Sequence, residues 1–181
     1  MHAGDRSTTP RSEPFPAEPG ESPQFLGFRL AGLACAIPLQ AVQQIVPMTL
    51  LSRPPGLPDI LEGFLNLRGA HVPVVQMRRL FDFPPAEPGL HTPVIIMQTP
   101  QNRLGLWVDS VTSIIRAPEH TLTPLPCGQI LNNCAQARIE GQAPVHLLCP
   151  ERILLEQERQ AIAQLHSALE LRLRQLGQDF R

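Results

Sequence analysis

The sequence predicts an all-β fold that is followed by one long C-terminal α-helix. Short apolar runs recur between residues 25 and 148, and glycines and prolines separate them. No long helical pattern lies between these runs, so the alternation of strands and helices that builds a parallel sheet is missing. Regular short strands with this punctuation are typical of a small β-barrel or a pair of barrels.

The chain divides into three parts by composition. Residues 1–24 are rich in Pro, Ser, Gly and Glu, and they contain too little apolar surface to offset their chain entropy. We therefore expect a disordered leader over residues 1–24, a β domain over residues 25–155, and a helix over residues 156–181.

The first apolar runs predict two strands, Phe25–Leu30 and Leu33–Ile37, which meet at Ala31 and Gly32. The next stretch is ambiguous. Val42, Ile45 and Val46 fit one helical turn, which Pro47 would end.

The stretch ILEGFLNLRGAHVPVVQMRRLF predicts a hairpin, with strands over residues 60–67 and 71–77. Arg68, Gly69 and Ala70 form the expected turn, where Gly69 suits a positive φ. Pro73 cannot donate a ladder hydrogen bond, so we expect its strand at a sheet edge or with a bulge.

Further strands are predicted toward the C-terminus. TPVIIMQT and RLGLWVDSVTSIIRAP supply two or three, and Ile139–Gly141 and Val145–Leu148 supply two short ones. Asp109 lies within the second of these stretches, with no second carboxylate or nucleophile beside it in any motif. We interpret it as a turn or strand-end residue.

Residues 151–176 contain neither Pro nor Gly and carry an apolar stripe at steps of three and four. The stripe consists of Ile162, Leu165, Leu169, Leu173 and Leu176. It predicts an amphipathic helix of about 25 residues, near 38 Å long. The stripe either packs on its own domain or mediates self-association, and the first is the more common arrangement.

Charge and composition disfavour several classes of function. The formal net charge is −1, lysine is absent, and the 15 arginines are spread along the chain, so the basic patch of a nucleic-acid binder is missing. Tyrosine is absent and Trp107 is the only tryptophan, which argues against stacking platforms for bases. Only 17% of residues are charged, which indicates a sparsely charged surface.

The cysteines and histidines show no spacing that indicates a metal or catalytic site. Cys35, Cys127, Cys134 and Cys149 include no CxxC pair, and the histidines are scattered. We expect no metal, no cofactor, no catalytic residues and free thiols. The N-terminal stretch lacks the apolar core of a signal peptide, and no apolar run reaches a membrane span, so we expect a cytoplasmic protein.

Several blocks of the sequence, in order, resemble the CheW-like family of bacterial chemosensory adaptors. The most specific is PGLPDILEGFLNLRGAHVPVVQMRRLF, with Ile-x-x-Gly, Asn-Leu-Arg-Gly and Val-Pro-Val-Val. FLGFRLAGLACAIPLQAVQQIV is similar to the opening strands, LGLWVDSVTSII to a later strand pair, and VHLLCPERILLEQE to the last strand before the helix. The resemblance covers roughly residues 25–158.

The resemblance implies two small five-stranded, SH3-like β-barrels packed over a shared apolar seam. It also implies a non-catalytic adaptor in two-component signal transduction, which couples the cytoplasmic tip of methyl-accepting chemoreceptors to a CheA-type histidine kinase. Such a protein would be associated with membrane receptor arrays through its partners. A divergent chemosensory pathway, controlling pili or biofilms, is the alternative, and Gln44, Gln76 and the long helix motivate it. An enzyme with Cys or His chemistry is a remote third hypothesis.

The same resemblance assigns Val42, Gly63, Asn66, Arg68 and Gly69 to the receptor-facing groove. The residues themselves leave a structural role open for each: Asn66 and Arg68 can satisfy the turn, the glycines can meet backbone requirements, and Val42 can belong to the core. The family often has acidic residues where Gln44 and Gln76 stand, so a half-buried Arg68 would need another carboxylate, such as Glu62 or Asp59.

Overall fold

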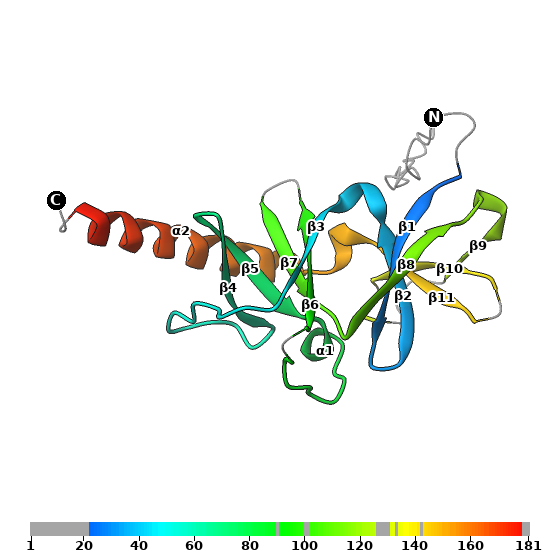
Figure 1. Cartoon of the computed structure of the whole chain (residues 1–181), viewed down its shortest axis with the longest axis horizontal. Helices are drawn as coiled ribbons and strands as arrows, with labels where there is room; N and C mark the ends of the chain where they lie inside the picture. The colour runs from blue at the N-terminus through cyan, green and yellow to red at the C-terminus, as the bar shows by residue number, and fades with distance from the viewer. Residues whose placement is uncertain are drawn as a thin grey trace, which may run out of the picture.

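The computed structural model of the chain contains two β-sheets that lie side by side along the longest axis, and a long C-terminal helix that runs along the second sheet and extends beyond it (Figure 1). It describes residues 22–89, 91–99, 102–125, 131–132, 134–141 and 143–178. Most of the predicted leader, residues 1–21, therefore lies outside the described residues, and its expected disorder stays a prediction.

The first sheet has six strands in the order β8-β1-β2-β11-β10-β9. It combines strands from both ends of the domain. Its members are β1 (Gln24–Leu30), β2 (Leu33–Pro38), β8 (Ser110–Arg116), β9 (Leu122–Pro124), β10 (Ala135–Ile139) and β11 (Val145–Leu148). All neighbours are antiparallel except β11 and β2, which run parallel.

The second sheet has five strands in the order β3-β6-β7-β5-β4 and is built from the middle of the chain. Its members are β3 (Val42–Pro47), β4 (Leu61–Leu67), β5 (Ala70–Gln76), β6 (Pro93–Gln98) and β7 (Arg103–Trp107). Here β5 and β7 are the parallel pair.

Short helical turns connect these strands. They are η1 (Leu39–Ala41), α1 (Met77–Leu80), η2 (Glu119–Thr121) and η3 (Pro150–Arg152). Through η1 the chain passes from β2 in the first sheet to β3 at the edge of the second, and after β7 it returns to β8 at the edge of the first. Each crossing therefore delivers the chain to an edge strand.

The apolar core explains why the two sheets form one unit. The largest buried cluster takes side chains from both sheets, among them Phe28 and Ile37 from the first and Phe64 and Leu106 from the second. Each sheet also has its own smaller cluster, one around Phe25 and the other including Trp107. This arrangement agrees with the expected pair of β modules over a shared apolar seam.

The all-β fold with a C-terminal helix is confirmed, with differences in detail. The strand expected at Ile139–Gly141 ends at Ile139, because β10 covers Ala135–Ile139. One sheet has six strands rather than five, because residues 122–124 form the short edge strand β9 that the sequence did not reveal. Residues 42–47 form the strand β3, so the expected helical turn was wrong: Val42, Ile45 and Val46 pair with β6 instead. The SH3-like barrel description stays a prediction.

The expectation for Pro73 was also wrong. Its strand β5 lies inside the sheet between β4 and β7, and the bulge near it is in β4, between Leu61 and Gly63. Pro73 is nevertheless compatible with this position, since the pairing of β5 with β7 begins only at the next residue, Val74.

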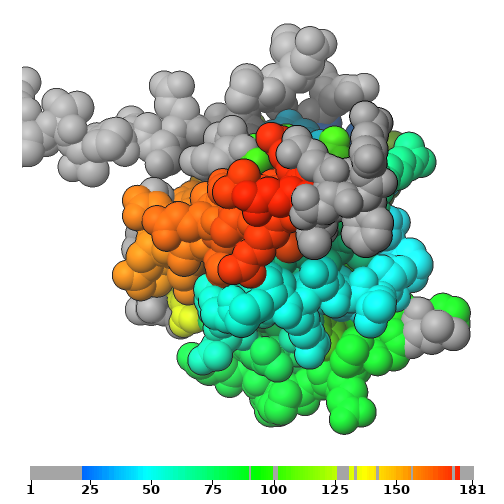
Figure 2. Space-filling view, turned by 90° about the vertical axis from the view of Figure 1, so that its left-hand side faces the viewer, coloured from blue at the N-terminus to red at the C-terminus, as the bar shows by residue number. Residues whose placement is uncertain are grey.

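The long helix α2 (Glu156–Gln178) packs its predicted apolar face on the domain. Ile162 is buried in the shared core, and Leu165 and Leu169 pack against it, while the side chains of Leu173 and Leu176 lie outside the described part. Figure 2 shows the helix lying against the β4–β5 segment. No described helix is long and apolar enough to span a membrane.

Candidate docking surface

The β4–β5 hairpin turns at Arg68 and Gly69, two of the predicted site residues. Their φ angles are +54° and +88°, and Leu67 pairs with Ala70 on either side of them. A two-residue loop with positive φ at both positions is a type I′ turn, which matches the twist of an antiparallel hairpin. The predicted positive φ of Gly69 is confirmed. That of Arg68 was not foreseen.

Asn66 has a structural role at this turn, because its side chain binds the backbone of the turn. Its Oδ1 accepts a hydrogen bond of 2.9 Å from the Gly69 amide, although the side chain is exposed. This interaction agrees with the structural interpretation of Asn66.

Arg68 itself is exposed, so the concern about a half-buried arginine without a carboxylate was unfounded. The suggested acid is engaged elsewhere: the buried Glu62 forms ion pairs with Arg53 and, at 3.5 Å, with Arg79. The backbone carbonyl of Asp59 accepts a hydrogen bond from the same Arg79. In the described structure Arg68 makes no ion pair, and its guanidinium is available at the tip of the hairpin.

Gly63 is required by a close approach of two backbone segments. It is buried in β4, where a Cβ atom would lie 2.8 Å from the carbonyl oxygen of Ser52 and 2.9 Å from the Cβ of Leu51. Ser52 forms a β-bridge with Phe64 at the same point. Gly63 thus lets residues 51–53 cover the outer edge of β4, and no side chain at this position faces a partner.

Val42 lies far from the hairpin in the order of the second sheet. It begins β3, at the opposite edge from β4, with β6, β7 and β5 between them. Its side chain is half-buried and packs against the shared core. The structure therefore brings Asn66, Arg68 and Gly69 together on one turn, but it does not place Val42 with them. The role of all five residues in binding stays a prediction.

Two exposed isoleucines on edge strands were missed by sequence reasoning. Ile45 on β3 is 44% exposed and Ile114 on β8 is 55% exposed. Strands β3 and β8 contain no fully buried residue, unlike the inner strands of both sheets. Unpaired strand edges with apolar side chains are natural contact sites for other proteins. The sequence contained only a weak indication of this exposure. Ile45 follows Gln44 and Ile114 follows Ser113, in strands where apolar and polar residues do not alternate strictly.

A charged pair holds the start of β8. Arg78 donates from Nε to Asp109 Oδ1 and from Nη2 to Oδ2, each at 2.7 Å, and the Ala31 amide donates to the same Oδ2 at 2.7 Å. Burial acts to raise the pKa of Asp109, but these hydrogen bonds outweigh burial and hold that pKa below its usual value. Asp109 lies between β7 and β8, which agrees with the predicted turn or strand-end position, and its partners identify it as a structural anchor.

Gln76, where the family often has an acid, is buried at the end of β5. Its Oε1 has no hydrogen-bond partner in the described structure. Gln44, the other departure, is exposed on β3. Arg68 therefore does not depend on either position for a partner.

The described thiols lack the properties of catalytic cysteines. Burial raises the pKa of Cys35 to about 12, and burial is also the largest cause that raises the pKa of Cys134 and Cys149 to about 11. A nucleophilic thiol has its pKa shifted in the opposite direction. Cys127 lies outside the described residues. Among the described residues no group of His, Cys, Asp and Glu side chains could hold a metal ion.

The sequence model of one protein family, the CheW-like domain, matches residues 24–158 of the chain. The chain belongs to this family. The predicted resemblance is therefore confirmed over the two sheets and the first residues of α2.

Several named proteins are similar to this CheW-like chain. The probable chemotaxis protein CheW of Rhizobium etli is 26% identical over 103 residues, 57% of this chain and 66% of that protein. The chemotaxis protein CheW of Helicobacter pylori is 27% identical over 103 residues, 57% of this chain and 62% of its own length. The matches thus span slightly less than two thirds of these relatives.

Two further relatives extend the comparison. Protein FrzA of Myxococcus xanthus is 26% identical over 145 residues, which cover 77% of this chain and 90% of FrzA. The crystal structure of the scaffolding protein TtCheW from Thermoanaerobacter tengcongensis has a TM-score of 0.67 at 21% identity, covering 71% of this chain and 89% of that one. At this level of identity the likeness shows a common fold.

Proposed function

We propose that this CheW-like protein is a non-catalytic adaptor that couples chemoreceptors to a CheA-type histidine kinase in chemosensory signal transduction. The single observation that carries the proposal is the match of the CheW-like domain to residues 24–158. The names of the relatives, several of which are chemotaxis proteins, support the chemotaxis pathway over the alternative of pilus or biofilm control. The adaptor would act in the cytoplasm, at the membrane arrays that contain its partners.

The docking surface that we assign to the receptor has two separate parts, the tip of the β4–β5 hairpin and the edge of β3, which lie at opposite ends of the strand order of the second sheet. Arg68 offers a guanidinium that makes no ion pair with the described residues, and Val42 and Ile45 offer apolar contacts on β3. Ile114 on β8 offers a second exposed apolar contact, on the other sheet.

The mechanism we propose is positional. The shared core packs the two sheets as one rigid unit, because side chains from both contribute to the same buried cluster. Docking faces on the two sheets are then held at a fixed distance and angle. A shift of a receptor on one face would change the contacts of the kinase on another, without any chemical step in the adaptor.

The test is binding of the purified full chain to fragments of its cognate receptor and kinase, measured by calorimetry. We expect Arg68→Glu and Ile114→Asp to weaken binding of at least one partner by tenfold or more, with an unchanged far-UV CD spectrum. Arg152→Glu is the matched control for charge, since Arg152 is exposed in η3, which is part of neither the β4–β5 hairpin nor the strands β3 and β8.

Two results would contradict the proposal. Binding of the unmodified chain to neither partner would remove the adaptor function. Loss of folding in Arg68→Glu would show that Arg68 acts within the fold, and the docking surface would then rest on the two isoleucines alone.

A further inference from the structure

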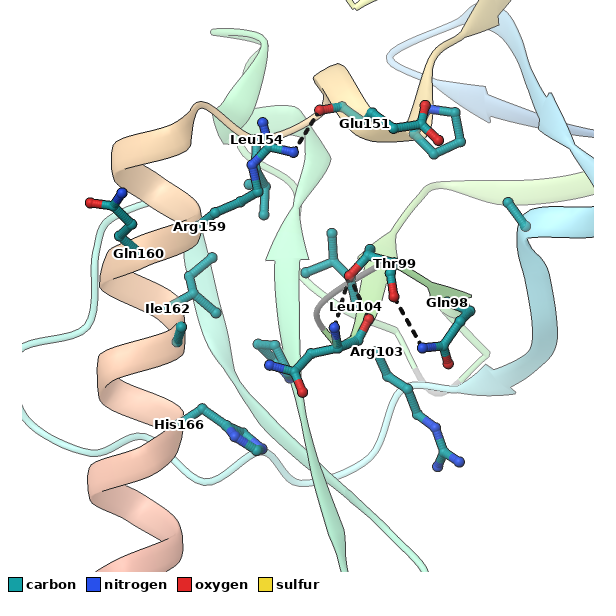
Figure 3. Close-up of a pocket in the computed structure, with 15 residues that line it drawn as sticks. Gln98, Thr99, Arg103, Leu104, Glu151, Leu154, Arg159, Gln160, Ile162 and His166 are labelled. Carbon is teal, nitrogen blue, oxygen red and sulfur yellow. Dashed lines mark hydrogen bonds between the residues drawn. The ribbon is translucent and has the colours of Figure 1, made fainter. Parts of the chain in front are cut away.

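A cavity of about 170 Å³ lies between helix α2, the turn η3 and the β6–β7 end of the second sheet. In Figure 3 the residues of α2 stand along one side, and Gln98, Thr99, Arg103 and Leu104 stand along the other. Neither the hairpin tip nor the edge isoleucines line it, so it is a different surface from the proposed docking site.

The floor of this cavity is apolar. Leu104, Leu154 and Ile162 are buried in the shared core and turn part of their surface toward it, and Pro73 and Ala41 complete the wall. Apolar cavities of about 150 Å³ bind a benzene molecule. The volume is therefore suited to one aromatic or large aliphatic side chain.

The cavity opens to the solvent along α2. Gln160 and Ala163, which line it on the helix side, are both exposed, as are Gln98 and Asn102 on the opposite side. A ligand can thus lie across the opening with one side chain inserted. An extended peptide has this shape, since successive side chains of an extended chain point in different directions.

The polar groups at the rim are mostly satisfied within the protein. The Gln98 amide donates to Thr99 O and accepts from Gln43, and the Thr99 hydroxyl pairs with Asn102 O. His166, at the lower end in Figure 3, places Nε2 2.7 Å from the carbonyl oxygen of His71. These groups offer few free donors or acceptors to a ligand.

Arg103 is the exception at the rim. It is exposed, and in the described part of the chain its guanidinium makes no hydrogen bond or ion pair. The other charged groups at the rim are Arg159, whose Nη1 donates to Glu151 O, and Glu151, whose Oε2 accepts from the Cys149 thiol. The rim therefore has an excess of positive charge above an apolar floor.

We propose that this cavity binds an extended peptide segment of a partner protein that carries one aromatic side chain next to a carboxylate. The aromatic ring fills the cavity above Leu104 and Ile162, and the carboxylate pairs with Arg103. The proposal rests on the volume, the apolar floor and the unpaired cation, and it does not depend on the proposed adaptor function.

The test uses the full chain and the synthetic peptide acetyl-Glu-Pro-Phe-Pro-Glu-amide, followed by NMR chemical shifts. Saturable shifts are expected at Leu104, Ile162 and Ala163. A peptide with Gln in place of both Glu, and one with Ala in place of Phe, should each bind at least fivefold more weakly. Prolines keep the probe extended and reduce the entropy cost of binding.

Two pairs of variants separate the cavity from the rest of the surface. Arg103→Glu should lower the affinity for the peptide at least fivefold. Arg172→Glu, on an exposed part of α2 outside the cavity, should change this affinity by less than twofold. Ala163→Trp should block the opening, while Ala168→Trp, which is exposed on the same helix and does not line the cavity, should not.

Each opposite result would overturn the proposal. Absence of saturable shifts at millimolar peptide would do so, as would shifts confined to the hairpin or to β3 and β8. Equal binding of the Glu and Gln peptides, or an Arg103→Glu protein that retains full affinity, would refute the charged contact. Far-UV CD spectra and thermal melts of all four variants verify that a loss of binding is not a loss of folding.

Discussion

Arg78 and Asp109 form a two-point ion pair that joins the two sheets. Arg78 belongs to α1, directly after β5 of the second sheet, and Asp109 precedes β8 of the first. Both oxygens of Asp109 accept from the guanidinium at 2.7 Å, and Oδ2 also accepts from Ala31 in the β1–β2 turn. One carboxylate thus fixes three chain segments at the place where the chain returns from one sheet to the other.

Replacing Arg78 by Ala should lower the free energy of unfolding by about 1–3 kcal/mol, since it removes two charge-assisted hydrogen bonds from a partly buried carboxylate. Urea unfolding followed by CD measures this loss. Arg138→Ala is the matched control, because the Arg138–Glu140 pair is exposed and solvent screening leaves such a pair with little effect on stability. Equal losses in the two variants would show that the pair between the sheets has no special role.

The same pair should make stability depend on pH in the acid range. The pKa of Asp109 is lower in the folded chain than its usual value, because the hydrogen bonds from Arg78 and Ala31 outweigh the opposing effect of burial. Its stabilising contribution is therefore complete above the unfolded pKa, about 3.9, and is lost as the pH falls through the lower folded value. The stability difference between the unmodified chain and Asp109→Asn should be largest near pH 7 and should shrink below pH 4. A difference that grows toward low pH would contradict this assignment.

The apolar pattern of the sequence predicted the strands that bury side chains. It wrongly indicated a helical turn where the exposed edge strand β3 lies. The runs at Phe25–Leu30 and in TPVIIMQT are apolar because their strands lie inside the sheets, so composition alone identified them. Strand β3 is an edge strand that pairs on one side only, with most residues exposed, so its pattern carries no two-residue alternation. Its apolar residues therefore fitted a helical turn equally well.

The site was predictable only where its geometry is local. Asn66, Arg68 and Gly69 lie within one hairpin, and turn chemistry placed them correctly. The pairing of Arg78 with Asp109, 31 positions apart, follows from the contact between the sheets, and no local pattern encodes it. The exposure of Ile114 likewise depends on β8 having a neighbour, β1, on one side only.

Gly63→Ala should destabilise the fold by at least about 2 kcal/mol. The new methyl group would lie 2.8 Å from the Ser52 carbonyl oxygen and 2.9 Å from the Leu51 Cβ, at a φ of +155° that side chains rarely adopt. Thermal melting followed by CD measures the effect. Gly141→Ala is the control, since the nearest atom to its added Cβ would be 3.8 Å away, an ordinary contact. A Gly63→Ala protein with unchanged melting would show that residues 51–53 can move away from β4.

Cys35 should resist alkylation in the folded protein. Burial raises its pKa to about 12, so the reactive thiolate is scarce at pH 7, and the side chain is almost inaccessible. Iodoacetamide labelling followed by mass spectrometry should show Cys149, which is half-buried, reacting before Cys35. Labelling in concentrated urea, where all four cysteines react, is the control. Rapid labelling of Cys35 in the folded chain would revive the hypothesis of thiol chemistry.

Arg68→Asn should stabilise the hairpin. The variant tests whether Arg68 serves binding or the fold. Arg68 adopts a φ of +54° at the first position of the type I′ turn, where Asn is preferred and other side chains are strained. We expect a gain of about 0.5–1 kcal/mol in the free energy of unfolding, measured by urea unfolding. Within the described structure Arg68 makes no ion pair that would offset this strain. A variant that is more stable but binds its partner less well would therefore indicate that the arginine serves binding. If stability falls instead, Arg68 has a structural interaction in solution, and the hairpin tip would lose its place in the docking surface.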